Sequence, residues 1–237
     1  MNNARVVAIV CAGGSGERLG LAGGKQLALV AGRAVLAWTI EALDATSEVD
    51  HIVLVCPASR VEEYRAAAID SVAPTTPVTY AASGPSRQAS VAAGIAVAPP
   101  EAEILLVHDG ARPLVTPEIV VSTIAAVEGD PLAAGAVVGQ PAIDTLKIAD
   151  GSVIVETPDR SKYWAVQTPQ TFRAQALRAA YAQAEEDGFV GTDDAAIVEH
   201  AGGRVLLVEG PRDNIKVTVP EDAVFVEAVL KQRAGGE

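Results

Sequence analysis

The chain has 237 residues, of which 49% are hydrophobic and 20% charged, a composition typical of a globular protein with a full core. Its 30 acidic side chains outnumber its 18 Lys and Arg, and the formal net charge of -12 argues against nucleic-acid binding. No apolar run is long enough to cross a membrane and no secretory leader is visible, so we expect a cytoplasmic protein without a membrane partner. We expect one domain over residues 1–237.

β-branched runs alternate with alanine-rich amphipathic stretches through the first half of the chain. We expect strands at 6–11, 51–56, 78–82 and 103–110, and helices at 34–45, 58–69, 86–98 and 117–128. Nearly continuous apolar strands separated by helices are typical of a parallel sheet that is covered on both faces. The sequence therefore predicts an α/β fold, Rossmann-like, with a mostly parallel sheet and helices on both faces.

The pattern changes near residue 140. Two alternating β-prone runs flank a central Ala-Asp-Gly in residues 144–158, which is typical of a β-hairpin. We expect this hairpin to leave the main sheet as a protruding β-arm at about 140–162. The α/β alternation then returns, with helices at 174–188, 193–203 and 221–232 and a strand at 204–210.

A glycine-rich loop with two cations follows the first strand. Residues 11–26, CAGGSGERLGLAGGKQ, contain six glycines together with Arg18 and Lys25. A P-loop is excluded because Lys25 is followed by Gln26 and not by a hydroxyl residue. A dinucleotide fingerprint is broken because Leu19 occupies its last glycine position. Two interpretations stay open: a loop whose N–H groups and cations wrap a triphosphate, and a flexible surface connection.

Two further segments place charged side chains near strand ends. HDGARP places Asp109 and Arg112 just after a buried-type strand. Ligands of parallel sheets bind outside the carboxyl ends of the strands, so we expect the loops after strands one, three and four to converge there. Asp109 could hold Mg²⁺ and Arg112 a phosphate, although a turn with a local Asp–Arg pair explains the pattern equally well. In DNIKVT, Lys216 follows Asp213 on a short β-prone run, and beside the other loops we interpret Lys216 as a phosphate contact.

Eight short motifs in one order resemble those of the 2-C-methyl-D-erythritol 4-phosphate cytidylyltransferases of the non-mevalonate isoprenoid pathway. They are AGGSGERLG with KQ, SRQASV, HDGARP, DTLK, DR, QTPQTF, TDDA and DNIKVT, and they span roughly residues 6–230. The resemblance implies transfer of a cytidylyl group from CTP to 2-C-methyl-D-erythritol 4-phosphate with release of pyrophosphate and a requirement for Mg²⁺. It also implies a parallel α/β domain that forms homodimers through a β-arm.

The resemblance assigns roles to individual residues. The catalytic cations at the triphosphate and α-phosphate would be Arg18, Lys25 and Lys216. The nucleotide would be bound by Ala12, Gly13, Gly14, Ser15, Gly16, Gly84 and Ser90. The acceptor side would be bound by Asp109, Arg112, Thr145, Arg160, Thr168 and Asp213. Asp109 and Asp213 would also lie around the metal.

The chain departs from the usual family pattern at three positions. Gly13 and Gly110 stand where members often have alanine, which loosens two loops without removing a charge. Pro85 has no N–H that could contact the base. Three other functions stay open: a cytidylyltransferase for another polyol phosphate such as ribitol 5-phosphate, a non-catalytic nucleotide sensor on the same fold, and a dehydrogenase, which the broken fingerprint weakens.

Overall fold

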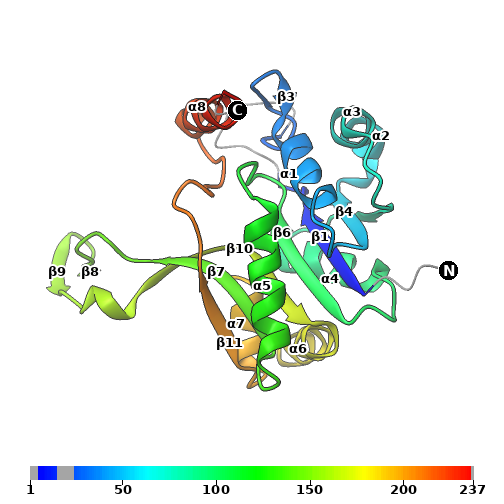
Figure 1. Cartoon of the computed structure of the whole chain (residues 1–237). Coiled ribbons are helices and arrows are strands. Elements are labelled where there is room, and N and C mark those ends of the chain that lie inside the picture. Colours follow the sequence, from blue (N-terminus) through cyan, green and yellow to red (C-terminus); the bar gives the residue numbers. More distant parts are fainter. Residues whose placement is uncertain (1–4, 15–23, 236–237) are drawn as a thin grey trace.

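A seven-stranded sheet organises the computed structural model, which describes residues 5–14 and 24–235. The strand order is β11-β7-β10-β6-β1-β4-β5 (Figure 1). The strands are β1 (Val6–Cys11), β4 (His51–Cys56), β5 (Val78–Ala82), β6 (Ile104–Asp109), β7 (Gly135–Pro141), β10 (Trp164–Arg173) and β11 (Val205–Glu209). The predicted α/β fold is confirmed.

One strand runs against the rest of this sheet. β10 pairs antiparallel with both β6 and β7, whereas the other described pairs are parallel. The sequence did not predict β7 or β10 as strands. β10 carries polar side chains and Pro169, which a central strand normally excludes. The proline is accommodated because the β7–β10 register shifts between Val166 and Gln170.

Helices cover both faces of the sheet. Those of one face are α4 (Arg87–Val97), α6 (Ala174–Asp187) and α7 (Asp194–His200). Those of the other face include α1 (Val35–Asp44) and α5 (Pro117–Gly129), and α8 (Pro220–Ala234) packs beside the short strands β2 (Leu29–Val30) and β3 (Arg33–Ala34). Among the described residues, no helix is both long and apolar enough to cross a membrane.

Alternation along the central strand explains why the sheet buries both faces. Val7 and Ile9 of β1 join the cluster under α4, α6 and α7, whereas Val6, Ala8 and Val10 join the cluster under α1 and α5. Successive side chains of a strand point to opposite faces, so one apolar run supplies two cores. The carboxyl end of β1 is thereby fixed in the middle of the sheet.

The predicted helix at 58–69 is divided into short segments. It consists of a 3₁₀ turn η2 (Ala58–Arg60), α2 (Val61–Tyr64), a π-helical turn η3 (Arg65–Ile69) and α3 (Asp70–Val72). The segment ends at Ala73, whose φ of 51° lies in the left-handed region.

The predicted β-arm is present and leaves the main sheet. Strands β8 (Ile148–Asp150) and β9 (Val153–Glu156) pair with each other in a separate two-stranded sheet, which Figure 1 shows projecting from the body. Gly151, with φ of 56°, forms the turn. The chain returns through the 3₁₀ turn η4 (Arg160–Lys162) into β10. The arm and its base expose the large apolar side chains of Ile143, Ile148, Val153, Ile154, Val155 and Tyr163.

Close packing of α4 on the sheet gives a stability prediction. A Cβ at Gly94 would lie 2.4 Å from Ile9 Cγ2 and 3.0 Å from Val55 Cγ2. Alanine normally favours a helix over glycine by about 1 kcal/mol, but overpacking a core costs about 1–3 kcal/mol. We expect Gly94→Ala to lower the free energy of unfolding by up to about 2 kcal/mol in urea titrations, the overpacking cost less the helix gain.

Gly129→Ala is the matched control. A Cβ at Gly129, at the end of α5, would meet no atom within 4 Å. This change should leave the unfolding free energy unchanged or slightly higher. Equal stabilisation by both substitutions would contradict the packing argument.

Candidate active site

Loops at the carboxyl ends of β1, β5 and β6 surround one cavity of about 360 Å³. Its lining comprises Cys11, Gly13, Gly14, Lys25, Gln26, Gly84, Pro85, Ser86, Arg87, Ser90, Asp109, Ala111 and Lys216. The predicted convergence of the three loops is therefore confirmed. The cavity wall combines glycines, which bring backbone close to a ligand, with cationic side chains.

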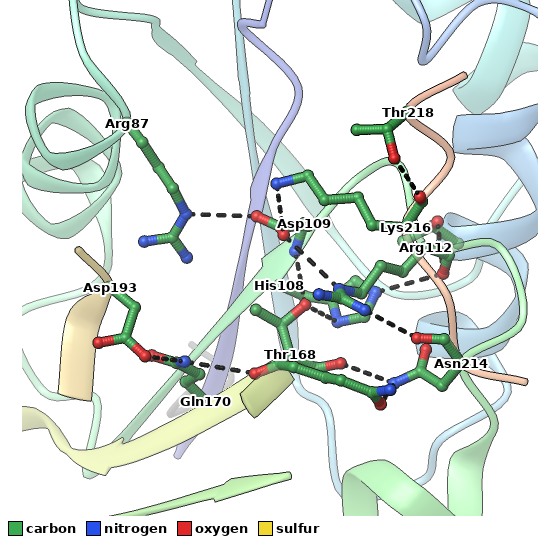
Figure 2. Close-up of polar contacts among 12 residues, drawn as sticks. Arg87, His108, Asp109, Arg112, Thr168, Gln170, Asp193, Asn214, Lys216 and Thr218 are labelled. Carbon is green, nitrogen blue, oxygen red and sulfur yellow. Dashed lines mark hydrogen bonds and ion pairs between the residues drawn. The ribbon is translucent and has the colours of Figure 1, made fainter. Parts of the chain in front are cut away.

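Asp109 is a nearly buried carboxylate among three cations (Figure 2). Its Oδ2 lies 2.8 Å from Lys216 Nζ and 3.6 Å from Arg112 Nε, and its Oδ1 lies 3.3 Å from Arg87 Nε. Burial by itself raises the pKa of Asp109, but the charges of Lys216 and Arg87, with Arg112, hold that pKa well below its ordinary value. Because three cations face this one carboxylate, the cavity wall favours an anionic ligand.

Thr168 of β10 supports Asp109 from the neighbouring strand. The Asp109 N–H donates to Thr168 Oγ1 over 3.0 Å, and that hydroxyl donates to His108 Nδ1 over 3.1 Å. Burial lowers the pKa of His108 to about 4, so the imidazole is neutral at pH 7. His108 is fully buried and helps to fix the position of the strand end.

The segment before α8 is tied to the same place. Asn214 Nδ2 donates to Thr168 O over 2.9 Å and to Gln167 Oε1 over 3.0 Å. Arg112 Nη1 donates to Asn214 O over 2.8 Å. These bonds fix the loop that carries Lys216 against β10 and β6. Arg112, whose side chain is only 11% exposed, thus acts as a brace between Asp109 and this loop.

Several residues without a predicted role complete the cluster. Arg87 Nη2 lies 2.7 Å from Asp194 Oδ2, and Tyr181 OH donates to Asp194 Oδ1 over 2.6 Å. Gln170 Oε1 accepts from the N–H groups of Asp194 and Ala195, each over 3.1 Å. Arg87, Gln170 and Asp194 lie inside the quoted motifs, but their pairing joins segments far apart in sequence.

The predicted nucleotide-binding residues are placed as follows. Gly13, Gly14, Gly84 and Ser90 line the cavity, while Ala12 is buried behind it. Ser90 Oγ accepts from the Gly84 N–H over 3.1 Å and donates to Ser86 O over 2.8 Å, so it holds the loop after β5 in shape. The predicted residues Ser15, Gly16 and Arg18 lie outside the described residues.

Three predicted acceptor-side residues take no part in the Asp109 cluster. Thr145 and Arg160 are exposed at the arm, where the Arg160 guanidinium donates to Ile143 O. Asp213 Oδ2 lies 3.0 Å from Arg233 Nη2 of α8. Within the described chain, the structure therefore brings together Lys25, Asp109, Arg112, Thr168 and Lys216. No ion pair or hydrogen bond between described residues joins Thr145, Arg160 or Asp213 to Asp109.

The close approach of Ser83 explains why a glycine occupies position 13. A Cβ there would lie 2.3 Å from Ser83 Cβ and 2.7 Å from Ser83 Oγ. We expect Gly13→Ala to lower the free energy of unfolding by about 1–3 kcal/mol, because two loops at the cavity would be forced apart. Ser83→Gly vacates the space, so the double variant Gly13→Ala/Ser83→Gly should recover most of the loss.

Thermal and urea unfolding of the two single variants and the double variant measure this coupling. Ser83→Gly alone serves as the control for the loss of the serine. Additive effects of the two changes would refute the steric explanation.

Comparison with known proteins agrees with this geometry. The family model described as IspD, 2-C-methyl-D-erythritol 4-phosphate cytidylyltransferase, matches residues 6–232. A protein of that name from Syntrophotalea carbinolica is 40% identical over 226 residues, which cover 95% of this chain and 96% of that protein. Another from a Synechococcus species is 41% identical over 227 residues, covering 95% and 99%.

Solved structures show the same likeness. The 4-diphosphocytidyl-2C-methyl-D-erythritol synthase of Anaerococcus prevotii superposes with a TM-score of 0.84 at 28% identity and covers 97% of both chains. The 2-C-methyl-D-erythritol 4-phosphate cytidylyltransferase of Thermus thermophilus gives a TM-score of 0.76 at 31% identity, covering 96% of this chain and 99% of that one. Fold and sequence agree over nearly the whole length, and the chain belongs to the 2-C-methyl-D-erythritol 4-phosphate cytidylyltransferase family.

Proposed function

We propose that this chain transfers the cytidylyl group of CTP to 2-C-methyl-D-erythritol 4-phosphate and releases pyrophosphate, the reaction of its family. One observation carries the proposal: Lys216, Arg87 and Arg112 surround a buried carboxylate at the wall of a glycine-lined cavity, which Lys25 also lines. Such a wall suits a triphosphate, because backbone N–H groups and cations share its charge.

The reaction requires little acid–base chemistry. The acceptor's phosphate monoester is already an anionic nucleophile, so the difficulty is to bring two anionic phosphates together in line. Positioned cations can neutralise the charge that develops on the α-phosphate and on the leaving pyrophosphate. His108 is buried and neutral beside Asp109, which agrees with a mechanism that needs no histidine base.

Lys216 is the described cation best placed at the α-phosphate. Its ammonium lies against Asp109 Oδ2, yet the side chain keeps 33% of its surface exposed at the cavity. Lys25 lines the same cavity, where it would meet the triphosphate. Without nucleotide, Asp109 would keep the Lys216 ammonium in position, and bound phosphates would then also contact that ammonium.

We further propose Mg²⁺ as the cofactor, with Asp109 as its protein ligand. Asp109 stays ionised and presents oxygen, the donor that Mg²⁺ prefers. The described residues contain no group of three or more His, Cys, Asp or Glu that could hold a metal, so phosphate oxygens and water would supply most ligands. Asp213 pairs with Arg233 through Oδ2, while its buried Oδ1 accepts no hydrogen bond from the described residues. The ion would supply charge neutralisation at the phosphates.

The β-arm supports a homodimer with shared active sites. An isolated two-stranded ribbon is only marginally stable in water, and this one exposes Val153, Ile154 and Val155 to 60% or more. A two-fold partner that offers the same ribbon would cover these side chains. Thr145 and Arg160 would then reach the acceptor site of the partner subunit, which explains why they lie apart from the Asp109 cluster in one chain.

A pyrophosphate-release assay tests the reaction. With CTP and Mg²⁺, release should depend on 2-C-methyl-D-erythritol 4-phosphate, and EDTA should abolish it. Lys216→Ala should lower kcat/KM by about 100-fold or more, the scale of one lost pre-placed donor at a transition state. Lys231→Ala is the control, since Lys231 is exposed and pairs with Glu227 on α8. Faster turnover with ribitol 5-phosphate would reassign the acceptor, and CTP binding without turnover would indicate a sensor.

Complementation tests the shared site. If Arg160 completes the site built on Lys25 of the other subunit, Arg160→Ala and Lys25→Ala homodimers should each be nearly inactive. After subunit exchange of equal amounts, half the dimers are mixed and each has one intact site, so about a quarter of wild-type activity should return. Differently tagged subunits verify the exchange. Verified exchange without recovery would show that Arg160 serves its own chain.

A further inference from the structure

A mostly buried series of polar groups leads from helix α6 to the active-site carboxylate, and only Arg87, 29% exposed, reaches the cavity surface appreciably. Tyr181 of α6 donates to Asp194 of α7, Asp194 pairs with Arg87 at the start of α4, and Arg87 pairs with Asp109 at the end of β6. The three contacts measure 2.6, 2.7 and 3.3 Å in that order. Four elements that are separate in sequence are thereby joined behind the cavity wall.

Removing these charged and polar groups from water costs free energy. Asp194 is fully buried and Tyr181 is 7% exposed. Burial raises the pKa of Tyr181, and the neighbouring Asp194 carboxylate raises it further, so the phenol stays a donor. Burial alone lowers the pKa of Arg87, but the charges of Asp194 and Asp109 raise it above its usual value. Buried ion pairs contribute little net stability compared with apolar packing, so stability by itself is a weak reason for this arrangement.

Arg87 contacts one oxygen of Asp109, and the other two cations contact the second oxygen. Arg87 uses Nη2 for Asp194 and Nε for Asp109 Oδ1, as a rigid guanidinium fork can do. Oδ2 pairs with Lys216 Nζ at 2.8 Å, and Arg112 Nε lies farther from it, at 3.6 Å (Figure 2). Arg87 lines the cavity, but its guanidinium cannot change orientation there without breaking the ion pair with the fully buried Asp194.

We propose that Arg87, anchored by Asp194 and Tyr181, is a positioning residue that sets the orientation of Asp109 and through it the place of Lys216. This inference rests on the proposed function, since it concerns the cations that act on the phosphates. Positioning matters most at the transition state, where phosphates and cations must align. Loss of the anchor should therefore lower kcat with little change in the affinity for CTP.

Tyr181→Phe tests the anchor with the smallest change. It keeps the ring and removes the hydroxyl that donates to Asp194. We expect kcat to fall about tenfold, equivalent to roughly 1.4 kcal/mol, while the Kd for CTP from calorimetry stays within about twofold. Tyr80→Phe is the control: Tyr80 is half-buried on β5 and takes part in none of these contacts, so its kinetics should match the wild type.

A second background separates positioning from a general structural effect. In Asp109→Asn enzyme the positioned carboxylate is gone, so adding Tyr181→Phe should change the residual kcat by less than about twofold. The same loss in both backgrounds, or a wild-type kcat for Tyr181→Phe, would overturn the inference.

Arg87→Lys provides a variant that does not depend on the tyrosine. Lysine keeps the charge but has one nitrogen and cannot bridge two carboxylates as the guanidinium does. We expect kcat to fall by about tenfold or more with the Kd for CTP again little changed. Wild-type kcat in Arg87→Lys would overturn the inference even if Tyr181→Phe did not fold. Failure of the proposed function would look different, because the wild type and Tyr80→Phe would then both lack turnover with 2-C-methyl-D-erythritol 4-phosphate.

Discussion

The ionised carboxylate of Asp109, nearly buried at the end of β6, is the constraint on which the site depends. Burying a carboxylate is unfavourable unless opposite charges and donors compensate it. Here Lys216, Arg87 and Arg112 approach from three separate segments, and the Thr168 hydroxyl accepts the Asp109 N–H. Compensating one charge thus gathers the cations that a triphosphate requires.

The antiparallel strand β10 connects the segments that surround Asp109. It lies between β6 and β7 and brings Thr168 to Asp109 and Gln170 to the start of α7. Asn214 bonds to the same strand and carries the Lys216 loop into place. A strand that is poor in apolar residues can occupy the middle of the sheet because its polar groups bond to the site.

The β-arm is the part of the fold that would contact a second subunit. It adds exposed apolar surface but no contact to the Asp109 cluster within the described chain, and it carries Thr145 and Arg160 near its base. Only Thr145 and Arg160 among the predicted acceptor-side residues lie at the arm, away from the Asp109 cluster, and this separation fits our proposal of a site built from two subunits. In our proposal the carboxyl ends of the strands would bind the phosphates, and the arm of a partner subunit would supply Thr145 and Arg160.

The sequence by itself determined the mostly parallel α/β fold, the arm and the glycine-lined, cation-bearing cavity, because apolar periodicity, turn residues and contiguous motifs are local properties. It also predicted Asp109, Lys25 and Lys216 as site residues from those motifs, and all three line the cavity. Only the tertiary structure decided that β10 enters the sheet antiparallel and that Arg87 bridges Asp109 and Asp194. Asp109 lies 22 positions and Asp194 107 positions from Arg87 in the sequence. The strand register and helix packing that bring these three residues together leave no periodic signal in the chain.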